Sequence, residues 1–195
     1  MYLQLLPEIP EDSKLRQEWN TLVQQMERPE IFYTYEWALA MQRAYGRVAQ
    51  PLLVLAYEDG RLRGVAALAT HPGRQDFSFL SATTADYCDF VSGPGDRKAV
   101  IENVLSELRG RPVRRIRLAN LPANSSSATI LSGLRRSLGI HVFSRPAYRC
   151  AQISLGSQNE RERRKAGLFG KKIRRYLTAL QREGPVTVDH LRIFG

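Results

Sequence analysis

Two apolar runs, residues 51–57 and 61–69, stand on either side of a short polar turn that contains Asp59 and Gly60. A two-residue hairpin turn needs positive φ at both central positions, and Asp-Gly is among the dipeptides that adopt it most readily. The first run is continuously apolar, which is typical of a strand inside a sheet. The pattern therefore predicts that the two runs pair antiparallel as a β-hairpin.

Helical and strand-like segments are mixed along the rest of the chain. Trp19, Leu22 and Met26 repeat with the period of an α-helix, and Thr34 is a candidate N-cap for the helix that follows it. Helices are predicted at residues 12–27, 35–45, 96–108 and 126–138, and strands at residues 2–6, 77–80, 87–91, 113–118, 140–155 and 186–192. Since hairpins and helices alternate, we expect an α/β or α+β fold of three layers, not a purely doubly wound sheet.

The composition limits the classes of function. The chain has 195 residues with 43% apolar content, and 29 Lys and Arg against 19 Asp and Glu give a net charge of +10. This excess favours anionic partners such as phosphates, nucleotides, nucleic acid or acidic lipid. Cys88 and Cys150 fit neither a Cys-x-x-Cys pair nor a secreted disulfide framework, and we expect no metal site. No run is long and apolar enough to span a membrane and no secretory signal is visible, so the expected compartment is the cytoplasm.

The strongest concentration of charge lies in residues 158–184, which hold nine Lys or Arg against three Glu. Within it, Ile173, Leu177 and Leu180 share one helical face, which we expect to pack inward. The four cations of the same helix are expected to face solvent or an anion; they are Lys171, Lys172, Arg174 and Arg175. Three interpretations stay open: a solvated amphipathic helix, a site for a phosphorylated small molecule or acyl carrier, and a nucleic-acid interface.

Residues 86–90 form the most concentrated polar group in an otherwise apolar stretch. On a strand, Tyr87 and Asp89 would share one face, with Asp86 on the other. A carboxylate beside a phenol can accept a proton from a substrate or hold an amine, so Asp86, Tyr87 and Asp89 are the candidate catalytic residues. The alternative is a strand entry whose aspartates cap turns.

Two glycine-containing motifs have the outline of phosphate loops. Arg61, Gly64 and Ala66 fit the Arg-x-x-Gly-x-Ala pattern of a pyrophosphate loop, but they follow a hairpin turn and no helix is predicted after them. Residues 167–172 lack the spacing and the Ser or Thr of a P-loop. Neither motif is therefore predicted to bind phosphate.

Five segments, taken in order, resemble the CelD/BcsL-type acetyltransferases of the GNAT superfamily. The first is the helix with Glu36-Trp37 that ends at Tyr45-Gly46. The others are the hairpin with Asp59-Gly60 and residues 64–68, the Asp86-Tyr87-x-Asp89-Phe90 segment, the Leu118-x-x-Leu121-Pro122 segment, and the Lys171-Lys172-x-Arg174-Arg175 helix ending in Arg182-Glu183-Gly184.

The resemblance implies a GNAT-like mixed, largely antiparallel sheet flanked by helices, in a protein built from two GNAT-like halves and associated with cellulose or other exopolysaccharide synthesis. It divides the chain into an N-terminal domain (1–157), a basic connecting helix (158–184) and the start of a second half (185–195). The implied activity is acyl transfer from acetyl-CoA or another acyl-CoA, without a metal, to an amine of a cell-envelope or exopolysaccharide precursor. We expect the chain alone to be inactive. The alternative is a non-catalytic module that binds nucleic acid or another polyanion through the basic helix.

Overall fold

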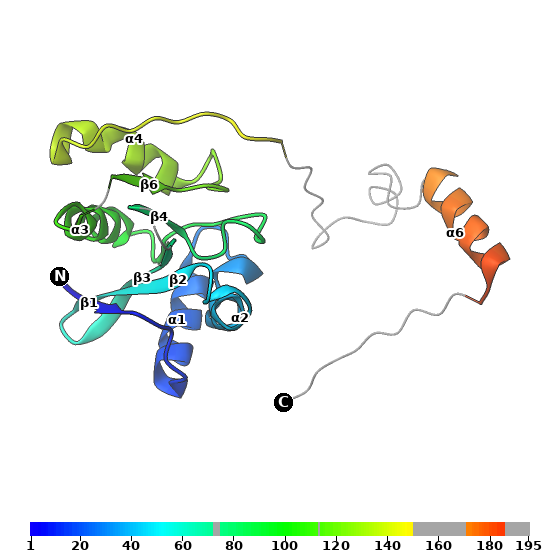
Figure 1. Ribbon diagram of the computed structural model, residues 1–195, viewed down its shortest axis with the longest axis horizontal. Coiled ribbons are helices and arrows are strands. Elements are labelled where there is room, and N and C mark those ends of the chain that lie inside the picture. Colours follow the sequence, from blue (N-terminus) through cyan, green and yellow to red (C-terminus); the bar gives the residue numbers. More distant parts are fainter. Residues whose placement is uncertain (72–74, 113, 150–170, 186–195) are drawn as a thin grey trace. The chain divides into compact units, whose positions relative to one another are not determined.

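The computed structural model describes residues 1–71, 75–112, 114–149 and 171–185 (Figure 1). The chain divides into two compact units, Met1–Ala147 and Tyr148–Gly195. The elements of the first unit are β1 (Tyr2–Leu6), α1 (Ser13–Gln25), the 3-10 helix η1 (Ile31–Tyr33), α2 (Tyr35–Tyr45), β2 (Gln50–Glu58), β3 (Arg61–Thr70), β4 (Asp76–Phe79), β5 (Val91–Ser92), α3 (Arg97–Arg109), β6 (Arg115–Arg117) and α4 (Ser126–Leu138). In the second unit the structure describes one helix, α6 (Lys171–Glu183).

The strands form one sheet in the order β1-β2-β3-β4-β6, and β5 also pairs with β3. All pairs are antiparallel except β4 with β6, which are parallel. The predicted hairpin is confirmed: Glu58 pairs with Arg61, and Asp59 and Gly60 have φ of 50° and 72°. The mixed, largely antiparallel sheet flanked by helices is the fold class that the sequence predicts.

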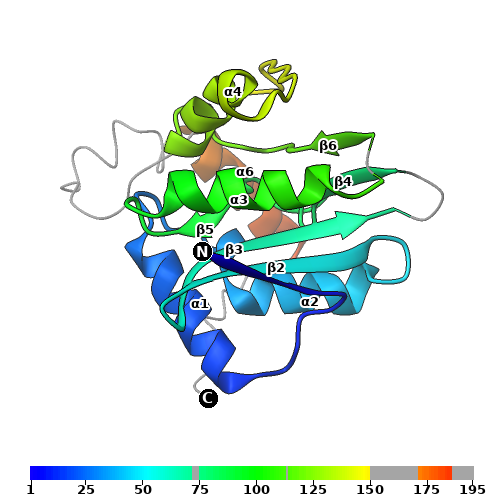
Figure 2. The same ribbon diagram turned by 90° about the vertical axis from the view of Figure 1, so that its left-hand side faces the viewer.

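Helices cover both faces of this sheet, so the first unit has the three layers expected (Figure 2). Side chains alternate along β2: Leu53 and Leu55 enter a core with α1, η1 and α2, whereas Val54 and Ala56 enter a core with α3 and α4. This alternation follows from the two-residue period of a strand, and it explains the continuous apolar run, since both faces are buried.

Local capping explains where the helices begin. The Asp12 side chain accepts hydrogen bonds from the backbone N–H groups of Lys14 and Leu15, and the Thr34 side chain accepts one from Trp37. These bonds satisfy donors that the first turn of a helix leaves unpaired. Ser125 caps α4 in the same way, and Gly139 ends that helix with φ of 63°. The sequence predicted the bounds of these three helices, and those of α3, within two residues.

Two strand predictions are wrong in the described part of the chain. Residues 87–90 are irregular, and only Val91–Ser92 pair with β3. The described part of the predicted strand pair, residues 140–149, has no strand pairing, and residues 141–149 are exposed. A strand needs a partner to satisfy its backbone groups, and the alternation of side chains alone does not supply one. The remainder of that pair and the strand at 186–192 lie outside the described residues.

Candidate functional site

The segment that the sequence singled out, residues 86–90, connects β4 to β5 and is fixed by Asn120. The backbone N–H of Cys88 donates to the carbonyl of Asn120 at 2.9 Å, while the Asn120 side chain donates to the carbonyls of Ala82 and Ala85 at 3.0 and 2.8 Å. Asn120 has φ of 61°, a left-handed conformation that asparagine tolerates better than most residues. The loop after β4 is thus bonded to the loop after β6 in place of extending as a strand.

Asp89 is turned into the protein and forms an ion pair with Arg97 at the start of α3. The Asp89 Oδ2 lies 3.3 Å from Arg97 Nη1, and the two side chains are 5% and 3% exposed. Arg97 also donates to the carbonyls of Phe90 and Ser92 and to the Ser127 hydroxyl at 2.9–3.1 Å. Arg97 therefore joins three segments: the strand entry, the first turn of α3 and the first turn of α4.

Burial dominates the acidity of Asp89. Loss of hydration raises the pKa of this carboxyl above its ordinary value, against the opposing effects of the Ser127 hydrogen bond and the Arg97 charge. Its Oδ1 accepts from the backbone N–H of Phe90 at 2.8 Å. An amine from solvent therefore meets a carboxyl that is already buried and partnered, whereas Asp86 is exposed on the same segment. The role of these residues in acceptor binding or proton transfer stays a prediction.

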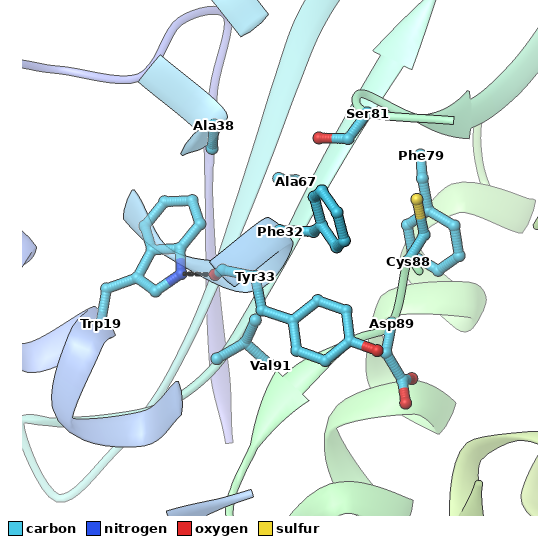
Figure 3. A pocket seen from close by; sticks show the side chains of 10 residues that line it. All are labelled: Trp19, Phe32, Tyr33, Ala38, Ala67, Phe79, Ser81, Cys88, Asp89 and Val91. Carbon is cyan, nitrogen blue, oxygen red and sulfur yellow. Dashed lines mark hydrogen bonds between the residues drawn. The ribbon is translucent and has the colours of Figure 1, made fainter. Parts of the chain in front are cut away.

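A small cavity lies beside Asp89 between the sheet and η1 (Figure 3). Its volume is about 20 Å³, and it is lined by Trp19, Phe32, Tyr33, Ala38, Ala67, Phe79, Ser81, Cys88, Asp89 and Val91. This space fits about one water molecule, far below the several hundred Å³ of a typical ligand pocket. It is too small for an acyl group and its carrier.

Two titratable side chains on this cavity are held in their neutral forms. Burial, and next the charge of Asp89, raise the pKa of the Cys88 thiol to about 12. Burial and the same carboxylate raise the pKa of Tyr33. Neither group is an activated nucleophile or base at neutral pH, since activation requires a lowered pKa for a thiol.

Three aromatic side chains from three separate segments contact one another, and one of them, Tyr87, directly follows Asp86 in the sequence. The Phe32 ring packs edge-to-face on Trp37 at 4.9 Å and is tilted against Tyr87 at 6.5 Å. All three rings are partly exposed. We call Phe32, Trp37, Tyr87 and Asp86 the aromatic–acidic patch. Within the described ranges no hydrogen bond or ion pair is seen for the Asp86 side chain, so its charge faces solvent.

The Arg61, Gly64 and Ala66 motif is part of β3, as its position after the hairpin turn predicts. A Cβ on Gly64 would lie 2.5 Å from both γ carbons of Val100 in α3. The glycine therefore allows a helix to approach the sheet closely, and the backbone here is engaged in strand pairing with β2 and β5. Close helix packing and strand pairing therefore explain the motif, and no role in phosphate binding is needed to explain it.

The four cations predicted to bind an anion lie in α6, within the second unit. Arg175 is exposed, whereas the side chains of Lys171, Lys172 and Arg174 lie outside the description. Leu177 and Leu180, expected to pack inward, are exposed. The sequence pattern gave the amphipathic face correctly but not its burial, because amphipathicity alone does not specify what covers the face. Anion binding by this cluster stays a prediction.

Two kinds of site are not found among the residues that the structure describes. They contain no group of three or more His, Cys, Asp or Glu placed to hold a metal ion. None of their helices is both long enough and apolar enough to pass through a membrane.

Comparison with known proteins gives likeness in structure and none in sequence. No family model and no curated protein matches the chain. An aminoglycoside antibiotic 6'-N-acetyltransferase from Acinetobacter haemolyticus is similar with a TM-score of 0.43 and 12% identity, over 79% of this chain and 100% of its own. An acetyltransferase from Trypanosoma brucei is similar with a TM-score of 0.42 and 21% identity, over 77% of this chain and 99% of its own. The activity in these names is a property of those two proteins.

Proposed function

We propose that this chain is the acceptor-side half of a GNAT-type N-acyltransferase that modifies an amine of a cell-envelope or exopolysaccharide precursor with acyl-CoA as donor. The observation that carries the proposal is the aromatic–acidic patch, which joins two of the segments on which the family resemblance rests. Trp37 belongs to the first of them, and Asp86 and Tyr87 to the third.

The chemistry of the patch suits an amino sugar. The C–H faces of a sugar ring pack on partly exposed aromatic rings, and an exposed carboxylate pairs with an ammonium group. Asp86 would hold the protonated amine at the surface, while the half-buried rings of Phe32 and Tyr87 would contact the sugar. Acyl transfer then requires the amine to lose a proton and attack the thioester carbonyl, with a hydrogen-bond donor near the carbonyl oxygen to stabilise its developing negative charge. The C–S bond then breaks, and the CoA thiolate leaves and takes up a proton to become the free thiol.

We propose that the donor is bound by residues outside the first unit, in a second GNAT-like half. Parallel strands that part from each other offer free backbone groups to a ligand, and β4 and β6 part after Ser78 and Arg117. Here the loops that follow are bonded to each other through Asn120, and the cavity nearby has room for about one water. These facts support a first unit that binds and positions the acceptor, while residues outside this unit bind the thioester.

Calorimetric titration of the chain tests both parts of the proposal. With glucosamine oligosaccharides we expect saturable binding that Asp86→Asn weakens about fivefold to tenfold, the loss of one exposed charge-assisted contact. Asp59→Asn is the matched control, because it removes an exposed carboxylate and Asn-Gly supports the same hairpin turn. With acetyl-CoA we expect no micromolar binding.

Each titration can contradict one part of the proposal without affecting the other part. If the oligosaccharides do not bind, or bind equally to the Asp86→Asn variant, the acceptor site is wrong. If acetyl-CoA binds with micromolar affinity, the donor site lies within this chain and the division between halves is wrong.

A further inference from the structure

Helix α6 exposes an apolar face along with its cations. Tyr176, Leu177 and Leu180 are 57%, 45% and 58% exposed, and their spacing places them on one stripe of the helix. Arg175 and Arg182, also exposed, lie seven positions apart on the opposite side. An isolated helix of 13 residues is marginal in water, and most helices of this length are stabilised by packing of their apolar face.

We propose that α6 binds the surface of an anionic lipid membrane, with its axis parallel to the surface and its apolar stripe among the acyl chains. Helices that bind in this way combine a strongly charged face, rich in Lys and Arg, with a stripe of aromatic and aliphatic residues and a low mean hydropathy. The five cations and one anion of Lys171–Glu183 give this helix a net charge of +4. This inference goes beyond the proposed acyltransferase and rests on α6 alone.

The charge distribution favours a lipid surface. Residues 148–195 hold eleven Lys or Arg against four Asp or Glu, so the second unit carries +7 of the chain's +10. An anionic leaflet attracts such a segment over about one Debye length, roughly 8 Å at physiological ionic strength. Attraction brings the helix to the surface, and insertion of Leu177 and Leu180 holds it there.

The apolar stripe distinguishes this partner from nucleic acid. The phosphates of a nucleic acid interact favourably with cations, and its bases stack on aromatic rings, but neither interacts favourably with two exposed leucines. A lipid interface interacts favourably with cationic, aromatic and aliphatic residues alike, because its headgroups are anionic and its interior is apolar. The combination on α6 therefore fits lipid better than a polynucleotide.

Co-sedimentation of the full chain with vesicles tests the proposal. On equal parts of phosphatidylglycerol and phosphatidylcholine we expect binding, and on phosphatidylcholine alone at least tenfold weaker binding. Leu177→Gln with Leu180→Gln should weaken binding to the anionic vesicles at least about tenfold, because two aliphatic side chains no longer leave water. Arg175→Gln with Arg182→Gln should weaken it about twentyfold at low salt, from the loss of two lipid-attracted charges.

Matched control variants come from exposed residues of the first unit. Ile31→Gln with Val48→Gln removes two exposed aliphatic side chains, and Arg47→Gln with Arg114→Gln removes two exposed charges. Both controls should bind vesicles within about twofold of the parent chain. Circular dichroism checks that all variants keep the parent's thermal unfolding midpoint.

Three results would overturn the proposal. Absence of binding to the anionic vesicles would mean that the apolar stripe is covered by another protein segment or has no binding partner. Full binding by the double leucine variant would reduce the interaction to surface adsorption of cations. Binding to double-stranded DNA that is tighter than to vesicles, lost in the arginine variant and kept in the leucine variant, would assign α6 to nucleic acid.

Discussion

The close approach of α3 to β3 at Gly64 gives a quantitative prediction. In a Gly64→Ala variant the new Cβ would meet both γ carbons of Val100 at 2.5 Å, where carbon atoms normally rest about 3.5–4.0 Å apart. Val100 is completely buried in the core between the sheet and α3, so it has no free space into which to rotate. The helix must move away by about 1 Å, or Val100 must leave its rotamer.

Overpacking of this kind costs about 1–3 kcal/mol. Alanine also reduces the conformational freedom of the unfolded chain, which returns up to about 1 kcal/mol. We therefore expect Gly64→Ala to lower the free energy of unfolding by about 1–2 kcal/mol, measured by urea denaturation. Gly133→Ala in α4 is the control, since an added Cβ there meets nothing within 4 Å. That change should leave stability unchanged or raise it by up to about 1 kcal/mol.

A double-mutant cycle isolates the contact itself. Val100→Ala removes the two γ carbons and should cost about 2 kcal/mol through the cavity it leaves. Combined with Gly64→Ala, the new methyl group occupies part of that cavity, so the double variant should be more stable than the sum of the single effects by at least about 1 kcal/mol. If the two effects add within about 0.5 kcal/mol, or Gly64→Ala is neutral, the close approach of α3 is wrong.

Three further predictions concern buried polar groups. Trp19→Phe should lower the free energy of unfolding by at least about 1 kcal/mol more than Trp37→Phe in urea, because Trp19 Nε1 donates a buried hydrogen bond at 2.8 Å, whereas Trp37 Nε1 has no partner among the described residues; equal decreases would contradict this. Because burial raises the pKa of Asp89, its folded form retains its proton longer, so the stabilising contribution of Asp89 should fall as pH rises through the interval between its ordinary and raised pKa values. The Asp89→Asn variant should lack this slope, and a contribution that rises with pH would mean that Arg97 outweighs burial. Cys88, with a thiol pKa of about 12, should react with iodoacetamide at neutral pH only at the rate of unfolding, as followed by mass spectrometry of its peptide; rapid labelling of the folded protein would refute its burial.

The parts of the fold that the sequence could predict depend on local interactions. The turn at Asp59 and Gly60 fixes the register of β2 with β3 because both residues adopt the positive φ that a two-residue loop demands. The helix start at Thr34 could be predicted for the same reason, since a cap acts within three residues of chain. Such signals need no knowledge of distant residues.

The candidate site could be predicted only in part because its geometry depends on distant partners. Residues 86–90 read as a strand, but the backbone is held by Asn120, and Asp89 is drawn inward by Arg97 at the start of α3. The ring contacts of Phe32 with Trp37 and Tyr87 bring the helix that contains Trp37 to the acidic segment, and no local sequence pattern predicts these contacts. An arginine at a helix start carries no local sign that it will be buried, because its usual place is the surface.

The charged residues of the two units differ in what they contribute to the stability of the fold. The first unit holds 18 of the Lys and Arg residues and 15 of the Asp and Glu residues, a surplus of +3, and its one fully buried ion pair joins Arg97 to Asp89 within the described residues. Loss of either partner would leave a buried charge unpaired, which lowers the free energy of unfolding by several kcal/mol. These two charged residues are therefore needed for the stability of the fold. The cations of α6 are under no such constraint where they are described: Arg175 and Arg182 are exposed, and exposed charges contribute little to folding. We therefore expect the cations of α6 to serve an anionic partner more than the stability of the chain that carries them.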